Sequence, residues 1–220
     1  MTSAYFLTGT DTEIGKTFIT CALLHRARMA GLSAVGIKPV AAGTDDLGRN
    51  DDVEAIRAAS SLALPEAVLN PYRYRSPIAP HIAAAEEGRQ IAVAPILKAS
   101  ELARAQADLL IVEGVGGFRV PLGADGDSAD LAVALGLPVI LVVGMRLGCI
   151  NHALLTVEAI AARGLVLAGW VANRVDPAMS RPEENIAALR ERIAAPLLGI
   201  VPHQADADPA MAAAHLHLPI

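Results

Sequence analysis

The chain has 220 residues, enough for one domain over residues 1–220 with a substantial buried core. Apolar residues make up 53% of it and aromatic residues only 3%, as expected of a parallel sheet covered by helices on both faces. The formal net charge is −5 without any basic block, so no nucleic-acid partner and no anionic membrane partner is expected. No apolar run reaches the ~20 residues of a spanning helix.

Only Cys21 and Cys149 are present, without a CxxC pair. Two such cysteines favour neither a disulfide framework nor a zinc site. The N-terminus does not show the pattern of a signal peptide, so none is expected. The default expectation is therefore a reducing, cytoplasmic setting.

Apolar strands alternate with helical segments along the chain. Strands are predicted over residues 4–7, 33–40, 109–112, 138–143, 167–172 and 197–201. Helices are predicted over residues 16–30, 53–62, 92–107, 128–135, 150–163 and 181–194. A loop is expected over residues 41–52 and an irregular excursion over residues 70–80. This alternation predicts an α/β fold, a doubly wound and mostly parallel sheet like that of P-loop NTPases.

Between the first strand and the first helix lies the glycine-bounded stretch GTDTEIGKT, residues 9–17. A strand, a glycine-bounded loop and a helix form the layout of a phosphate cradle, in which backbone N–H groups and the helix N-terminus attract an anion. Lys16 can reach the β- and γ-phosphates, and the Thr17 hydroxyl can ligate Mg²⁺. Five residues instead of four separate Gly9 from Gly15, so the prediction depends on the strand and helix context. The simpler interpretation is a turn with an exposed lysine.

Polar side chains follow several of the predicted strands. Lys38 stands beside Pro39, and Glu113 is followed by Gly114, in the manner of a Walker-B carboxylate. Asn173 ends another strand, and Asp52 can join from its loop. Ligands of open α/β sheets bind at this carboxyl edge. The alternatives are a strand-end lysine, a surface acid and, for Asp52, a helix cap.

Together these residues predict an enzyme that uses a Mg²⁺-nucleotide. A P-loop with Mg²⁺ ligands implies ATP or GTP and phosphoryl transfer, which depends on positioning and charge neutralisation. Lys16 and Lys38 can both face the transferred group, so a small anionic acceptor in line with the γ-phosphate is expected. The residues alone lead no further.

Six stretches resemble the dethiobiotin synthetase family, and the match runs along nearly the whole chain. They are residues 8–17 (TGTDTEIGKT), 38–40 (KPV), 80–81 (PH), 112–117 (VEGVGG), 147–152 (LGCINH) and 168–173 (AGWVAN). The five-residue loop spacing is itself a trait of that family. The resemblance implies a homodimeric ligase of biotin biosynthesis that uses ATP and Mg²⁺. Its substrates would be 7,8-diaminopelargonic acid and CO₂, which form a carbamate that ATP phosphorylates before the ureido ring closes.

The resemblance also implies roles for residues at matching positions. Catalysis is assigned to Lys38, which would hold the carbamate, and to Lys16. The nucleotide is assigned to Glu13, Ile14, Gly15, Lys16, Thr17, Phe18, Asp52, Glu113, Gly114, Val115, Gly116, Asn173, Arg174, Pro202, His203 and Gln204. Mg²⁺ is assigned to Thr17, Asp52 and Glu113. The substrate is assigned to Thr12, Lys38, Cys149, Ile150 and Asn151, the last three acting across a subunit boundary at a helix N-terminus suited to a carboxylate.

The sequence differs from the family pattern at one position, and there are two alternative functions. Family members commonly have Ser-Gly after Lys-Pro-Val-Ala, whereas this chain has Ala42-Gly43-Thr44, so a hydroxyl contact with the substrate is absent. The main alternative is a switch-type P-loop ATPase of the partitioning kind. Those proteins carry a signature lysine where this chain has Asp11. The other rival, a glutamine-dependent amidase, needs a second domain for which 220 residues leave no room.

Overall fold

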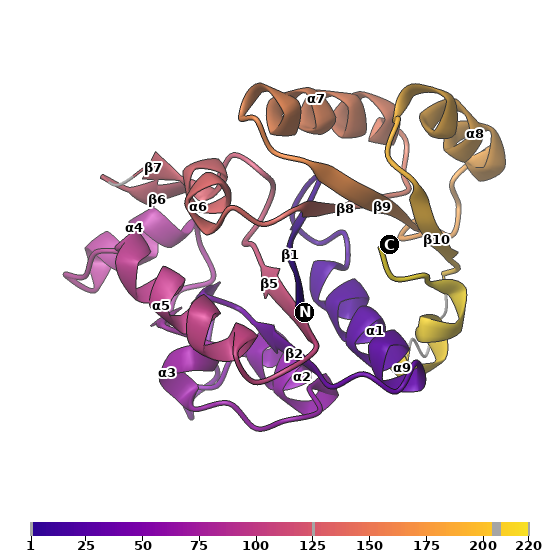
Figure 1. Ribbon diagram of the computed structural model, residues 1–220. Coiled ribbons are helices and arrows are strands. Elements are labelled where there is room, and N and C mark those ends of the chain that lie inside the picture. Colours follow the sequence, from indigo (N-terminus) through magenta and orange to yellow (C-terminus); the bar gives the residue numbers. More distant parts are fainter. Residues whose placement is uncertain (1, 125, 204–207, 220) are drawn as a thin grey trace.

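The computed structural model describes residues 2–124, 126–203 and 208–219. A six-stranded sheet, in the order β10-β9-β8-β1-β5-β2, runs through the middle of the molecule (Figure 1). Its strands are β1 (Ser3–Gly9), β2 (Ala34–Ile37), β5 (Leu109–Glu113), β8 (Val139–Gly144), β9 (Leu167–Asn173) and β10 (Leu197–Val201). Every pairing in this sheet is parallel, so all the carboxyl ends meet at one edge. The predicted doubly wound fold is confirmed.

Helices cover both faces of the sheet. They are α1 (Lys16–Met29), α2 (Asp51–Ala59), α3 (Glu66–Leu69), α4 (Pro80–Glu86), α5 (Val93–Arg104), α6 (Ser128–Leu135), α7 (Cys149–Ala162), α8 (Pro182–Arg192) and α9 (Pro209–Ala212), with a 3₁₀ turn at Ala213–His215. Around β8 and β9, α7 and α8 lie on one side of the sheet and α1 and α9 on the other (Figure 1). Alternate residues of β8 accordingly join different cores: Leu141 belongs to the buried cluster that includes residues of α7 and α8, whereas Ile140 belongs to the cluster that includes residues of α1.

Burial explains why the strands could be predicted. All residues of β5 and β8 are buried, which is what a strand covered on both faces requires. The predicted helices are also confirmed, with ends that shift by a few residues. Among the described residues, no helix is both long enough and apolar enough to cross a membrane.

The predicted strand over residues 33–40 was wrong in one respect, because it is two strands. It breaks at Lys38 and Pro39 into β2 and β3 (Val40–Ala42). Pro39 has no N–H to give to a ladder, and the Lys38 N–H donates to the Leu69 carbonyl at 2.9 Å instead of to a neighbouring strand. The chain therefore turns away from the main sheet directly after Lys38.

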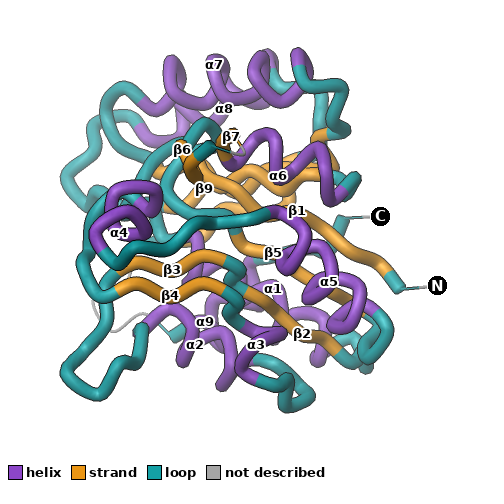
Figure 2. The backbone as a smooth tube through the Cα atoms, turned by 90° about the vertical axis from the view of Figure 1, so that its left-hand side faces the viewer, coloured by secondary structure: helices purple, strands orange, loops and turns teal. Residues whose placement is uncertain are grey.

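The region expected to be irregular contains regular structure. β3 pairs in parallel with β4 (Tyr72–Tyr74), and the two run side by side next to α4 in Figure 2. The loop expected over residues 41–52 therefore begins only after Ala42. The prediction of an irregular excursion over residues 70–80 was wrong at β4, which is a regular strand. A short hairpin of β6 (Pro121–Gly123) and β7 (Gly126–Asp127) was not predicted either. Of these small strands, β3 contributes Ala42 to the lining of the site described next.

Candidate functional site

The loop between β1 and α1 is held in shape by an asparagine from a distant strand. Gly15 begins the helix with φ of 79°, a conformation that L side chains rarely adopt. A Cβ at this position would lie 2.4 Å from Asn173 Nδ2, so the loop and the asparagine fit closely only because residue 15 is glycine. The Asn173 Nδ2 donates to the Ile14 carbonyl at 2.9 Å. Asn173 thus ties the end of β9 to the phosphate loop.

Lys16 lies at the first position of α1 and its side chain folds back over the loop. Its Nζ donates to the Asp11 carbonyl at 2.7 Å. Burial lowers the pKa of Lys16 to about 8, with Glu113 partly opposing that effect and Lys38 adding to it. An ammonium that burial has made costly is one that a phosphate would stabilise strongly.

Lys38 is surrounded by the residues predicted to bind metal. Its Nζ lies 2.5 Å from Asp52 Oδ2 and 2.7 Å from Glu113 Oε1. The Thr17 hydroxyl donates to the same Glu113 Oε1 at 2.6 Å and lies 3.5 Å from the lysine nitrogen. Thr17, Lys38, Asp52 and Glu113 therefore form one connected cluster, whereas Asn173, also expected at this edge, bonds to the loop instead.

Charge compensation dominates the electrostatics of this cluster. Burial alone would lower the pKa of Lys38, but the carboxylates of Glu113 and Asp52 more than offset it, and the pKa is raised. Burial would likewise raise the pKa of Asp52, yet the Lys38 ammonium holds it below its usual range. Lys38 therefore carries a full positive charge at neutral pH.

Strand register explains why these residues meet. Ile37 of β2 pairs with Val112 of β5, so Lys38 and Glu113 follow one another at neighbouring strand ends. Leu7 of β1 pairs with Glu113 and places the phosphate loop beside them. Asp52 comes from the first turn of α2, whose cap is Asn50 and not Asp52. The helix-cap alternative for Asp52 was therefore wrong.

These residues open into a cleft of about 910 Å³. It is lined by Thr12, Glu13, Gly15, Lys16, Thr17, Phe18, Lys38, Ala42, Asp52, Pro77, Ile78, Ala79, Pro80, Val115, Gly116 and Val120. Ala42 lines it, whereas Thr44 does not and instead bonds through its N–H to the Arg75 carbonyl at 3.0 Å. Thr44 therefore does not supply the hydroxyl that Ala42 lacks.

The donor set around Lys38 fits Mg²⁺. Thr17 offers a hydroxyl, and Asp52 and Glu113 offer carboxylates, which are the hard oxygen ligands this ion prefers. In the part of the chain that the structure describes, no group of three or more His, Cys, Asp or Glu could hold a metal. Mg²⁺ commonly takes one or two carboxylates together with substrate phosphates and water, which fits the hydroxyl and the two carboxylates found here.

Other predicted site residues lie apart from the cleft. Cys149, Ile150 and Asn151 form the first turn of α7 and do not line it. Arg174 forms an ion pair with Glu183 at 3.2 Å. Pro202 and His203 follow β10, and Gln204 lies outside the described residues.

Sequence reasoning missed two supports of the cluster. Asn70 Nδ2 donates to the Lys38 carbonyl at 2.6 Å and fixes the backbone where β2 ends. Thr20 Oγ1 donates to Glu113 Oε2 at 2.6 Å. The spacing of Thr20 from Thr17 was a usable signal, because residues three apart share one face of a helix. No local pattern pointed to Asn70.

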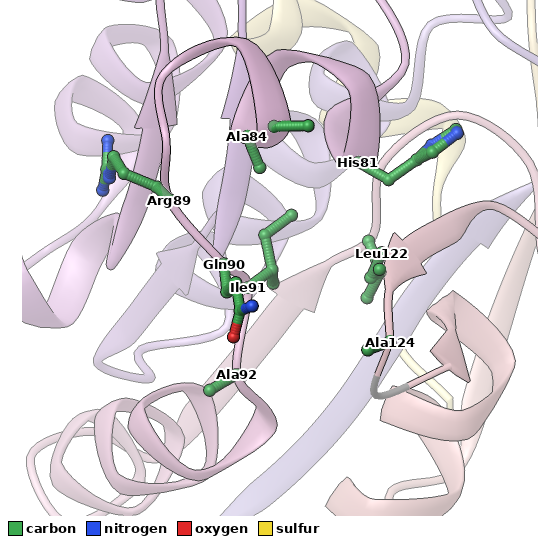
Figure 3. A pocket seen from close by; sticks show the side chains of 10 residues that line it. His81, Ala84, Arg89, Gln90, Ile91, Ala92, Leu122 and Ala124 are labelled. Carbon is green, nitrogen blue, oxygen red and sulfur yellow. The ribbon is translucent and has the colours of Figure 1, made fainter.

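A smaller hollow of about 160 Å³ lies between α4 and β6. Its centre is lined by Ala84, Ile91 and Leu122, while Arg89 and His81 stand on opposite sides of it (Figure 3). Arg89 is instead engaged with the Tyr74 ring, 4.8 Å from its centre. Because its polar side chains do not converge, this hollow offers a ligand little specific recognition.

Comparisons with known proteins agree with this geometry. The family described as an AAA domain matches residues 3–211. The ATP-dependent dethiobiotin synthetase BioD of Aromatoleum aromaticum is 67% identical over 219 residues, which cover 98% of this chain and 97% of that protein.

Solved structures resemble the chain at much lower identity. The septum site-determining protein MinD of Pyrococcus horikoshii, complexed with Mg-ADP, has a TM-score of 0.57 at 14% identity and covers 93% of this chain and 82% of its own. A ParA family ATPase from Chlorobium tepidum has a TM-score of 0.53 at 15% identity and covers 96% and 89%. These two likenesses show the P-loop NTPase-like fold alone.

Proposed function

The chain belongs to the dethiobiotin synthetase family, and we propose that it closes the ureido ring of dethiobiotin from 7,8-diaminopelargonic acid, CO₂ and ATP. The observation that carries this function is the pair of buried lysines, Lys16 and Lys38, that line one cleft beside Glu113. One lysine suits the nucleotide phosphates and the other suits a small anionic acceptor. A carbamate is such an acceptor.

The reaction joins two amines to one carbon. One amine of the substrate attacks CO₂ and loses a proton, which gives a carbamate. A carbamate oxygen then attacks the γ-phosphorus of ATP, and ADP leaves. The second amine attacks the carbamate carbon and loses a proton, phosphate leaves, and the ring is closed.

The cleft supplies charges that suit the phosphoryl transfer. Lys38 would hold the carbamate through its ammonium, which the two carboxylates keep protonated. The loop over residues 13–18 would wrap the phosphates with its backbone N–H groups, and Lys16 would leave the Asp11 carbonyl to meet them. Bound Mg²⁺, held by Thr17, Asp52 and Glu113, would neutralise charge on the phosphate oxygens.

The remaining nucleotide positions form a second, looser part of the proposed site. Val115 and Gly116, which come after Glu113 and Gly114, line the cleft. Thr12, proposed to contact the substrate and not the nucleotide, lines it on the loop side. Asn173, Arg174, Pro202, His203 and Gln204 are proposed to meet the adenine. The Asn173 amide nitrogen is already committed to the loop, so in the described structure its carbonyl oxygen is the atom better suited to a base.

We extend the proposal to a homodimer that works in the cytoplasm. Cys149, Ile150 and Asn151 begin a 14-residue helix after Gly148. The Cys149 N–H donates to the Arg146 carbonyl at 3.0 Å, so the N–H groups of Ile150 and Asn151 are the ones that suit a carboxylate. They do not line their own chain's cleft. The substrate carboxylate would therefore reach the first turn of α7 in a second copy.

The partitioning-ATPase alternative shares only the fold. Asp11 occupies the position of the signature lysine, and its carboxylate pairs with Arg146. The relative at 67% identity also favours the ligase.

The function is tested by ADP release from Mg-ATP with and without the diamine and bicarbonate, and by mass spectrometry of the product. Turnover that depends on both additions, with dethiobiotin formed in step with ADP, is expected. Turnover is expected to be lost in Lys38→Ala and kept in the matched control Lys98→Ala, because Lys98 is exposed on α5. ADP release that ignores the diamine would contradict the proposal and favour the switch-type ATPase.

A further inference from the structure

The hydroxyl of Thr20 points from the second turn of α1 to the back of Glu113. Thr20 is fully buried, and its Oγ1 donates to Glu113 Oε2 at 2.6 Å. We propose that Thr20 is a positioning residue that orients Glu113 for the Mg²⁺-nucleotide. This inference rests on the proposed function, since it concerns the same carboxylate.

The two oxygens of Glu113 have different surroundings. Oε1 accepts from Thr17 at 2.6 Å and from Lys38 at 2.7 Å, and both of these residues line the cleft. Oε2 accepts from Thr20, which does not line it. Two hydroxyls from one helix, three residues apart, therefore donate hydrogen bonds to the two different oxygens of one carboxylate. These two hydrogen bonds fix the rotation of the carboxylate and keep Oε1 towards the cleft.

The bond is not the one that a threonine inside a helix ordinarily makes. Such a hydroxyl commonly returns to the carbonyl one turn earlier. Thr156 of α7 does this, donating to the His152 carbonyl at 2.7 Å. Among the described residues, the Thr20 hydroxyl bonds only to Glu113. The Thr20 rotamer therefore serves the carboxylate and not its own helix.

Packing holds this rotamer in place. A Cβ at Gly36 of β2 would lie 3.6 Å from the Thr20 methyl carbon, which places that methyl against the strand. With the methyl against β2, the hydroxyl is held towards the end of β5. Groups that hold a metal-binding carboxylate in this way typically change metal affinity about 10- to 100-fold when removed.

Thr20→Val removes the hydroxyl and keeps the shape, whereas Thr20→Ser keeps the hydroxyl and loses the methyl. The affinity for Mn²⁺ in the presence of ADP, followed by electron paramagnetic resonance, is expected to fall about tenfold or more in Thr20→Val. The Mn²⁺ affinity of Thr20→Ser is expected to stay within about threefold of that of the unchanged protein. The control Thr156→Val is expected to bind Mn²⁺ as the unchanged protein does. In steady-state assays of Thr20→Val, the Mg²⁺ concentration for half-maximal rate rises more than kcat falls.

Unchanged Mn²⁺ affinity in Thr20→Val would overturn the inference, and so would a loss in Thr20→Ser as large as that in Thr20→Val. If Thr20→Val does not fold, Thr20→Ala takes its place in the same comparison with Thr20→Ser. The binding measurement needs no diamine. A failure of the proposed function would appear in the turnover of the unchanged protein, whereas a failure of this inference appears only in the ratio between variants.

Discussion

The carboxyl edge of the sheet differs between its two ends. At the β2–β5–β1 end, Thr17, Lys38 and Glu113 bond to one another within one chain, and Lys38 and Glu113 are almost fully buried. At the β8–β9–β10 end, Asn151 and His203 are exposed and lie on separate elements. Under the proposed function, the difference teaches that the groups for phosphate chemistry are already assembled within one chain. The adenine and the substrate carboxylate would instead be recognised by exposed residues on separate elements.

The largest expected loss of activity comes from a change at the β2–β5–β1 end of the sheet edge. Lys38→Met keeps the length of the side chain but removes the ammonium, so a carbamate loses its counter-charge. We expect kcat to fall about 10²- to 10³-fold, the usual cost of removing one positioned charge or donor from a transition state. ADP affinity, measured by calorimetry, is expected to stay within a few-fold. Lys98→Met is the control, and a Lys38→Met enzyme with more than about a tenth of normal kcat would show that the ammonium is dispensable.

The second prediction concerns the tie between the two ends. Gly15→Ala places a Cβ 2.4 Å from Asn173 Nδ2 in a left-handed conformation. We expect a loss of about 1–3 kcal/mol in the free energy of unfolding from backbone strain, with a further loss from the clash. ADP affinity is expected to fall roughly tenfold, the equivalent of about 1.4 kcal/mol.

Gly164→Ala is the matched control for that variant. Gly164 has φ of 69°, but a Cβ there would meet nothing within 4 Å. It therefore reports the cost of the backbone conformation alone. Equal losses of stability and of ADP affinity in the two variants would show that the contact with Asn173 is unimportant.

The third prediction is a pH dependence from Lys16. Its pKa is about 8 in the folded chain, against 10.5 for the free group, because burial disfavours the charge. Below about pH 8 the lysine is charged in both states and the cost of burial is fully present. Between the two pKa values the unfolded chain binds more protons, so stability from this group rises with pH.

Urea unfolding of the nucleotide-free protein measures this effect against Lys16→Met, which cannot titrate. From pH 7.5 to 9.5 the difference in free energy of unfolding is expected to move in favour of the unchanged chain by about 1–2 kcal/mol. A difference that stays constant over this range would mean that Lys16 keeps an ordinary pKa.

The smallest expected effect is at the substrate side of the cleft. Ala42→Ser restores the hydroxyl that family members commonly carry, and residue 42 lines the cleft. We expect the KM for the diamine to fall about 2- to 10-fold with little change in kcat, as one added hydrogen bond provides. Thr44→Ala, outside the cleft, should leave KM unchanged. An unchanged KM in Ala42→Ser would show that the substrate does not reach this wall.

The sequence allowed most of the fold to be predicted, because the strands of the main sheet are apolar runs buried on both faces. The β3–β4 pair was missed since it joins two short segments about 30 residues apart, which no local pattern links. Lys38, Glu113 and Thr17 could be brought to one edge by the rule for parallel sheets. The orientation of Thr20 and the bond from Asn173 to the loop could not, because both depend on side-chain packing between distant elements.

The most direct test of the account asks whether one site takes its chemistry from one chain and its carboxylate anchor from another. Lys38→Met and Asn151→Trp are each expected to inactivate one of these parts. When the two inactive proteins are mixed and allowed to exchange subunits, each mixed dimer has one intact site if the site is shared. Diamine-dependent ADP release is then expected to recover to about a quarter of normal, because half of a statistical mixture is mixed dimer. No recovery, with subunit exchange verified by native mass spectrometry, would contradict the account and place both parts of the site in one chain.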